Sequence, residues 1–164
     1  MSSSPSPADA QAQQVAERVR EVMLADDHAT RALGIEIAEV GPGRALARMQ
    51  VRRDMLNGFG ICHGGLITTL ADTAFAYACN SANHVTVAAG VSVDFVAPAH
   101  EGDLLSAHCE QRTQQARTGV YDVLVRNQHG HTVALMRGRS HRLKSRQVFA
   151  EQDADGAGQP AARA

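Results

Sequence analysis

The stretch HGGLITTLADTAFAYACNSA, residues 63–82, decides the fold. From residue 65 to residue 82 it consists of Leu, Ala, Ile, Phe, Tyr and small polar residues, and Asp72 is its one charged side chain. A helix that is apolar on every side is expected to be buried on every side. The stretch therefore predicts a long helix at the centre of the domain.

Segments typical of β-strands lie on both sides of this helix in the sequence. They are a hairpin around the Gly41-Pro42-Gly43 turn and four alternating or β-branched segments at about residues 85–96, 103–115, 119–127 and 131–143. A curved antiparallel sheet of about six strands, wrapped around the helix, is the simplest way to bury it. The pattern thus predicts an α+β fold.

The chain of 164 residues is long enough for one domain, which we expect at residues 10–145. Val15, Val19, Val22 and Met23 follow the helical period and predict an additional N-terminal helix at about residues 10–24. We expect residues 1–9 and 146–164 to be disordered, because the start is rich in Ser and Pro and the end has no apolar period.

Composition and charge exclude several classes of function. With 16 Lys and Arg against 17 Asp and Glu, the net charge is −1, so neither a nucleic-acid nor a membrane partner is expected. No basic start leads into an apolar run, which favours a cytoplasmic protein without a secretory signal. The cysteines, at positions 62, 79 and 109, lack the spacing of a disulfide framework or a metal site.

Asp72 is the first candidate for chemistry. It is the one formally charged side chain between Asn57 and Val93. An ionised carboxylate in an apolar setting is costly unless it is hydrogen-bonded, paired or faces a cavity, and such groups are often functional. The alternative interpretation is that Asp72 bonds backbone amides or neutral side chains as an anchor in the core.

The paired glycines Gly64 and Gly65 are the second candidate, since they stand where the predicted helix begins. Backbone amides at a helix N-terminus suit an anion or a developing oxyanion, and glycine adds no bulk in front of them. The alternative is that the glycines only permit a tight entry into the helix. Together with Asp72 they describe an acyl-transfer site, with donors for the carbonyl oxygen and a carboxylate as base or nucleophile.

Spacing along the helix limits how these groups can cooperate. Gly64 and Asp72 are eight residues apart, which at the helical rise is about 12 Å. One carbonyl group cannot contact both at hydrogen-bond distance. We therefore expect a homodimer in which the glycine amides of one subunit face Asp72 of the other across a two-fold axis.

Three motifs resemble the PaaI group of hotdog-fold acyl-CoA thioesterases, named for phenylacetate degradation. They are MLNG (55–58), CHGG (62–65) and LADTAFAYACNS (70–81). The similarity continues through LG (33–34), DF (94–95), GVYD (119–122), VAL (133–135) and RGRSHR (137–142). It covers about residues 32–142, and the collinear spacing of the motifs makes it specific.

The resemblance implies a hotdog domain that pairs into dimers and commonly into homotetramers. It also implies hydrolysis of CoA thioesters, here of phenylacetyl-type and especially ring-hydroxylated phenylacetyl groups, with no cofactor or metal beyond the CoA of the substrate. By position, Asp72 would be the catalytic carboxylate and Gly64 the principal oxyanion donor, with Gly65 nearby. Asn57 and His63 would orient the substrate or water.

Further residues are candidates for substrate binding. Ser92 matches a serine that some relatives of this family place near the nucleophilic water. Arg137 and Arg139 alternate onto one face of the last strand and either hold the CoA phosphates or form a solvated edge. Tyr77 either lines a pocket for an aryl group or is part of the core.

Two other functions use the same features. Hydration of an enoyl-CoA on this fold would require an acid and a histidine acting together on one face of the substrate. A non-catalytic acyl-CoA sensor would bind ligand in the same groove and regulate a partner. We rank thioester hydrolysis above both.

Overall fold

The computed structural model of the chain describes residues 6–150. The helices are α1 (Pro7–Asp26), α2 (His28–Leu33), the short 3-10 helix η1 (Arg53–Met55) and α3 (Gly64–Asn80). The strands are β1 (Glu36–Gly41), β2 (Arg44–Gln50), β3 (Thr86–Phe95), β4 (Leu104–Gln115), β5 (Thr118–Arg126) and β6 (Thr132–Arg142). The sequence did not predict α2.

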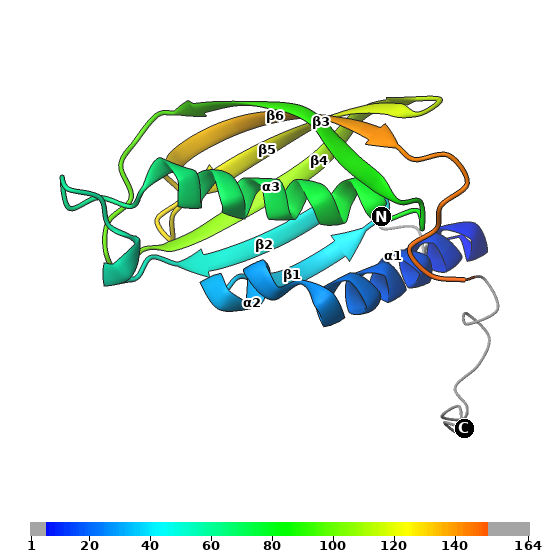
Figure 1. The fold of residues 1–164 in the computed structure, drawn as a ribbon, viewed down its shortest axis with the longest axis horizontal. Helices are drawn as coiled ribbons and strands as arrows, with labels where there is room; N and C mark the ends of the chain where they lie inside the picture. Colours follow the sequence, from blue (N-terminus) through cyan, green and yellow to red (C-terminus); the bar gives the residue numbers. More distant parts are fainter. Residues whose placement is uncertain (1–5, 151–164) are drawn as a thin grey trace, which may run out of the picture.

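The strands form one antiparallel sheet in the order β1-β2-β4-β5-β6-β3. Figure 1 shows the sheet curving around α3, which lies along its inner face. This confirms the expected α+β hotdog arrangement, with a central helix, six strands and an N-terminal helix. Strand β3 precedes β4 in the chain but pairs with β6, so it forms an edge of the sheet.

Helix α3 is buried on one side only, and the expectation of burial on all sides is wrong for the single chain. Ile67, Leu70, Ala74 and Phe75 on its inner side are at most 3% exposed. Gly138 of β6 permits this close packing, since a Cβ there would lie 2.8 Å from the Phe75 ring. The opposite side of the helix is not covered by the sheet.

Helix α1 begins at Pro7, earlier than the expected residue 10, because Ser6 caps it. The Ser6 hydroxyl accepts from the Asp9 amide, and the Asp9 carboxylate accepts from the Ser6 amide. Residues 7–9 therefore belong to the ordered domain, contrary to the boundary drawn from the sequence. The expected disorder of residues 1–5 lies outside the described residues.

Beyond the expected end of the domain at residue 145, the chain still contacts the domain. The Asn83 side chain accepts from the amides of Val148 and Phe149, at 3.1 and 3.0 Å, and donates to the Phe149 carbonyl. Phe149 is 9% exposed, so this residue packs against the body of the domain, while residues 144–147 are exposed. Residues 151–164 lie outside the described residues. Within residues 6–150, no helix has the length and apolar character needed to cross a membrane.

Candidate active site

His63 caps the start of α3 and distinguishes the two glycines that follow it. The Nδ1 atom of His63 accepts a hydrogen bond from the Gly65 amide at 3.2 Å. No acceptor within residues 6–150 pairs with the Gly64 amide. The Gly64 N–H is thus the open donor at the positive end of the helix, where a carbonyl oxygen gains most from it.

The cap also fixes the tautomer of His63. A neutral imidazole that accepts through Nδ1 carries its hydrogen on Nε2. Because the side chain is exposed, this Nε2–H can donate to a substrate or to water. The structure therefore gives His63 a structural role that the sequence did not reveal, besides the orienting role expected for it.

Asn57 holds the loop that precedes the helix. Its side-chain oxygen accepts from the backbone amides of Phe59 and Ile61, at 2.9 and 3.4 Å. The backbone N–H of Asn57 donates to the Ile61 carbonyl. These bonds use the oxygen of the carboxamide and leave the NH₂ group without an acceptor in the described part of the chain. Asn57 is thereby placed to donate into the adjacent pocket.

A pocket of about 520 Å³ opens between this loop, the start of α3 and the end of β3. Asn57 and Gly64 contribute its polar edge, and the remaining lining residues are almost all apolar: Ile61, Cys62, Ile67, Phe95, Val96, Ala97 and Pro98. Concave apolar pockets with a few convergent donors are typical ligand sites. This pocket can hold an apolar acyl group while its carbonyl oxygen meets the Gly64 amide.

Asp72 lies on the uncovered side of α3, two turns after Gly64, and its side chain is exposed in the single chain. It is not sealed in the core. Surrounding protein nevertheless removes part of its hydration, and this desolvation raises the pKa of the carboxyl above its ordinary value. A carboxylate with a raised pKa accepts a proton more readily, as a general base must.

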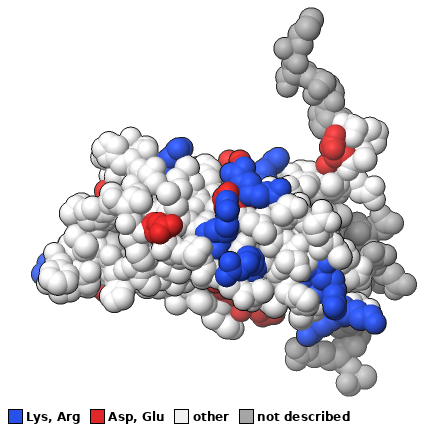
Figure 2. Space-filling model, turned by 90° about the horizontal axis from the view of Figure 1, so that it is seen from above, with Lys and Arg blue, Asp and Glu red and all other residues white. Residues whose placement is uncertain are grey.

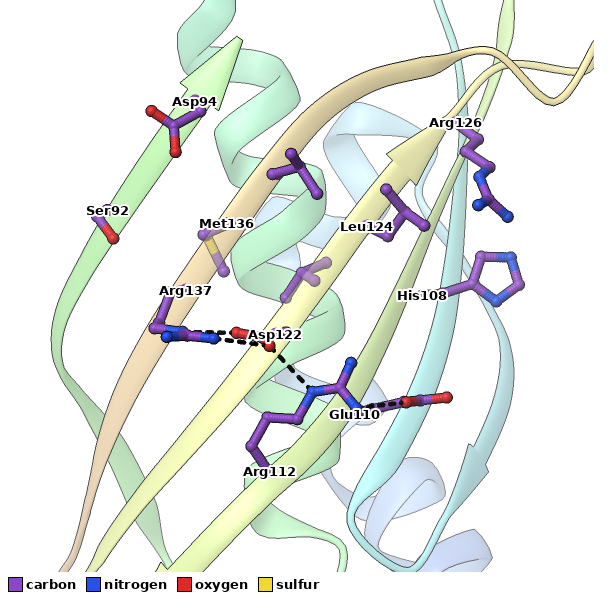
Figure 3. Close-up of a pocket in the computed structure, with 12 residues that line it drawn as sticks. Ser92, Asp94, His108, Glu110, Arg112, Asp122, Leu124, Arg126, Met136 and Arg137 are labelled. Carbon is purple, nitrogen blue, oxygen red and sulfur yellow. Dashed lines mark hydrogen bonds and ion pairs between the residues drawn. The ribbon is translucent and has the colours of Figure 1, made fainter. Parts of the chain in front are cut away.

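Ser92, Arg137 and Arg139 do not join this group. Ser92 pairs with Arg137 in the register of β3 and β6, while the neighbouring Met136 points inward and is 2% exposed. Figure 3 shows Ser92 and Arg137 on the side of the sheet turned away from the helix. Within one chain Ser92 thus lies on the other side of the sheet from Gly64 and Asp72, and its position near the reacting water stays a prediction.

On that outer face Arg137 is already engaged. Its guanidinium donates twice to Asp122, at 2.7 and 2.9 Å, and Arg112 donates to the same carboxylate at 3.0 Å (Figure 3). These bonds hold the pKa of Asp122 below its usual value. Basic and acidic side chains also gather near the middle of the molecule in the view of Figure 2. Arg139 remains exposed and lies beside Gly90.

The outer face carries its own depression, of about 610 Å³, lined by Ser92, Asp94, His108, Asp122 and Arg137 among others (Figure 3). Charged side chains make up half of its lining, with Val123, Leu124, Leu135 and Met136 among the rest, and within the described residues no helix N-terminus with an open amide borders it. We do not assign the hydrolytic reaction to it.

Tyr77 is placed in the core and not in a substrate pocket. It is fully buried, and its hydroxyl donates to Asp27 at 3.3 Å. Burial raises the pKa of this phenol, and the negative charge of the neighbouring Asp27 raises it further. The structure thus favours the packing alternative for Tyr77. No cluster of three His, Cys, Asp or Glu side chains suited to a metal ion occurs within the described residues.

Comparisons with known proteins agree with this geometry. The thioesterase superfamily matches residues 59–134. Over 121 residues the chain is 48% identical to the acyl-coenzyme A thioesterase PaaI of Escherichia coli, covering 74% of this chain and 86% of that protein. The chain belongs to the thioesterase superfamily. Within it, the similarity confirms the PaaI-type relationship indicated by the CHGG and LADTAF motifs.

Solved structures support the same membership. The PaaI protein from the phenylacetic acid degradation operon of Escherichia coli superimposes with a TM-score of 0.79 and 45% identity, over 80% of this chain and 96% of that one. A mutant of the phenylacetic acid degradation protein PaaI from Thermus thermophilus superimposes with a TM-score of 0.69 and 35% identity, over 71% of this chain and 100% of that one. This hotdog-fold chain is accordingly an enzyme of the thioester hydrolase class.

Sequence reasoning missed the apolar lining of the site. Phe95 matters most, because a Cβ on Gly64 would lie 3.0 Å from its ring. The apolar pair Phe95-Val96 was a usable signal for the pocket. Strand β3 ends at Phe95 on the edge of the sheet, and Phe95 and Val96 stay 53% and 54% exposed within their own chain.

Proposed function

We propose that this enzyme hydrolyses phenylacetyl-type CoA thioesters, ring-hydroxylated phenylacetyl-CoA included, to the free acid and CoA. The observation that carries the proposal is the open amide of Gly64 at the mouth of an apolar pocket, on a helix whose one carboxylate, Asp72, faces outward. The names of the bacterial relatives, which refer to phenylacetic acid degradation, point to the same acyl class.

The reaction follows from these groups. The thioester carbonyl oxygen accepts from the Gly64 amide, which stabilises the oxyanion that forms at this position. Asp72 of the second subunit removes a proton from water as the water oxygen attacks the carbonyl carbon. When the tetrahedral intermediate collapses, the C–S bond breaks and the CoA sulfur takes the proton back from Asp72. In the nucleophilic alternative the Asp72 carboxylate attacks the carbonyl carbon, the C–S bond breaks and CoA thiolate leaves; water then hydrolyses the resulting anhydride, which releases the free acid, regenerates the Asp72 carboxylate and gives a proton to the thiolate.

No cofactor enters this scheme. The thiolate of CoA leaves readily without further activation, so the steps need only one water, one carboxylate and one oxyanion donor. Asn57 lines the pocket and has a free NH₂ group, and His63, next to Gly64 in the chain, has an exposed side chain with a free Nε2–H. We assign them to orienting the substrate or the water.

The dimer in the proposal rests on strand β3. It forms an edge of the sheet, and Val87, Val91 and Phe95 on it are 45%, 40% and 53% exposed. An unpaired edge with apolar side chains is a template for pairing with another strand. Two β3 strands paired across a two-fold axis would join the sheets and bring the uncovered sides of both α3 helices together. Further pairing of dimers through the outer sheet faces would give the expected tetramer.

A thiol-release assay across hydroxyphenylacetyl-, phenylacetyl-, benzoyl- and straight-chain acyl-CoAs tests the function. We expect steady release that is fastest with the first two, and a loss of about 10²-fold or more in turnover for Asp72→Asn. Loss of enoyl absorbance without thiol release would instead show a hydratase. Saturable binding without turnover would show a sensor.

A further inference from the structure

Two buried side-chain polar atoms lack a hydrogen-bond partner within the described residues, and both lie near the end of β6. They are the hydroxyl of Ser140 and the Nε of Arg142. The residues are two apart on one strand, so they share its inner face, and Ser140 is fully buried. Buried donors are nearly always satisfied in folded proteins, so the Nε of Arg142, which unlike Ser140 lines a cavity, indicates a missing acceptor.

Arg142 faces a cavity of about 740 Å³ at the C-terminal end of α3. The cavity is closed on one side by α1 and on the other by the turn between β1 and β2. Since Gly64 and Asn80 mark opposite ends of α3, the cavity lies about 24 Å from the open amide, by the helical rise. It is therefore separate from the thioester site.

The charges in this cavity favour an anion. Arg44 and Arg142 both line it, and neither forms an ion pair within residues 6–150. The one acidic residue that lines it, Glu110, is already paired with Arg112 at 3.2 Å. Guanidinium groups match the planar geometry of a carboxylate, which would also give the Arg142 Nε its acceptor.

The uncharged residues that line the cavity determine which body can accompany the carboxylate of the ligand. Small apolar side chains from α1 and α3 form one wall, notably Ala12, Val15 and Ala78. Tyr121 forms part of another, and its hydroxyl is occupied as a donor to Gln111 at 3.0 Å. A dianion such as phosphate would leave these apolar surfaces without a partner, whereas a flat hydrocarbon body would cover them.

We propose that this cavity is a second, non-catalytic site for a small monocarboxylic acid with a ring-sized apolar body, held by Arg142 and Arg44. The site does not depend on the proposed hydrolysis. An acid bound there contacts Ala78 and Cys79 at the end of α3.

Equilibrium dialysis of labelled phenylacetate against the full-length protein tests the site. A saturating non-hydrolysable thioether analogue of phenylacetyl-CoA keeps the thioester site filled. We expect one acid to bind per chain, and inorganic phosphate at the same concentration not to displace it. Arg142→Gln, which removes the charge, and Ala12→Phe, which fills the cavity from a half-buried helix position, should each weaken binding by about tenfold or more.

Arg137→Gln is the matched control, since it removes an arginine of the same strand from the outer face. It should leave the affinity for phenylacetate unchanged, and Arg142→Gln should leave thiol release unchanged when no acid is added. The proposal is overturned if phenylacetate does not bind once the thioether is present, or if phosphate displaces it. Equal weakening by Arg137→Gln and Arg142→Gln would overturn it as well.

Discussion

The imidazole of His63 accepts the amide hydrogen of Gly65 through Nδ1, at 3.2 Å. This contact gives the paired glycines different functions, because it occupies one amide and leaves the other, on Gly64, for the substrate. The histidine of the CHGG motif therefore determines which amide at the start of α3 stays open for the substrate. Its loss should affect folding as well as catalysis.

The first prediction concerns this cap. His63→Ala removes the side-chain acceptor at the N-cap and should lower the free energy of unfolding by about 1 kcal/mol. His63→Asn keeps an acceptor that can reach the same amide, so it should recover most of that stability. Urea denaturation of both variants measures the difference. Equal destabilisation by Ala and Asn would show that the cap does not contribute.

The two glycines should respond differently to a methyl group. In Gly64→Ala the new Cβ would lie 3.0 Å from the Phe95 ring, beside the open amide, so kcat/KM should fall by about tenfold or more. In Gly65→Ala the nearest atom is His63 Nδ1, at 3.4 Å, and alanine favours the helix. That control should stay active and fold normally. A larger loss in Gly65→Ala would reverse the assignment of the oxyanion donor.

Asp72 should cost stability at neutral pH. Desolvation raises the pKa of its carboxyl in the folded state, so the folded protein binds this proton more tightly than the unfolded chain does. Ionisation then destabilises the fold as the pH rises through the folded pKa. Asp72→Asn removes this cost, so it should raise the melting temperature at about pH 7, with a gain that shrinks as the pH falls towards about 4.

Asp122→Asn is the control of opposite sign. The hydrogen bonds from Arg137 and Arg112 lower the pKa of Asp122, so its ionised form stabilises the fold above the unfolded pKa. This variant should therefore melt at a lower temperature at neutral pH, and the loss should fade under acid. If both variants shift the melting temperature in the same direction, burial is not what perturbs Asp72.

Strand β3 should control assembly. Val91→Asp would place a carboxylate on the apolar edge, and two such charges would meet across the proposed two-fold axis. We expect the dimer to dissociate at least about tenfold more readily, with a parallel loss of thiol release. Leu135→Asp changes a residue of similar exposure, 45% against 40%, on the neighbouring strand β6 and not on the edge itself, and should leave the dimer intact. Sedimentation velocity measures both, and an active, dimeric Val91→Asp protein would contradict the proposed interface.

Much of the fold could be predicted because its elements carry local signals. The long apolar run gave α3 to within two residues at its C-terminal end, and the β-branched segments gave β3 to β6 to within about two residues at each end. Helix α1 began earlier than expected because the cap at Ser6 and Asp9 was overlooked. Helix α2 was missed because its six residues are too short to show a period.

The candidate site was predicted less completely, because side-chain direction depends on tertiary detail. A bulge between Ala88 and Gly90 sets which face of β3 Ser92 occupies, and alternation in the sequence cannot reveal it. Tyr77 and Asp72 lie on one helix, yet only packing decides that the phenol turns to Asp27 while the carboxylate faces outward. That the Arg142 Nε is buried without a hydrogen-bond acceptor cannot be read from the sequence either.

The central claim is that each site combines Gly64 of one subunit with Asp72 of the other. Refolding a 1:1 mixture of Gly64→Ala and Asp72→Asn chains, each expected to be at least about tenfold impaired alone, tests it directly. Half of the dimers are then mixed, and each of these contains one intact site, so the mixture should regain about a quarter of wild-type thiol release. If both groups act within one chain, no mixed dimer has an intact site, and a mixture no more active than the average of its two components would contradict the account.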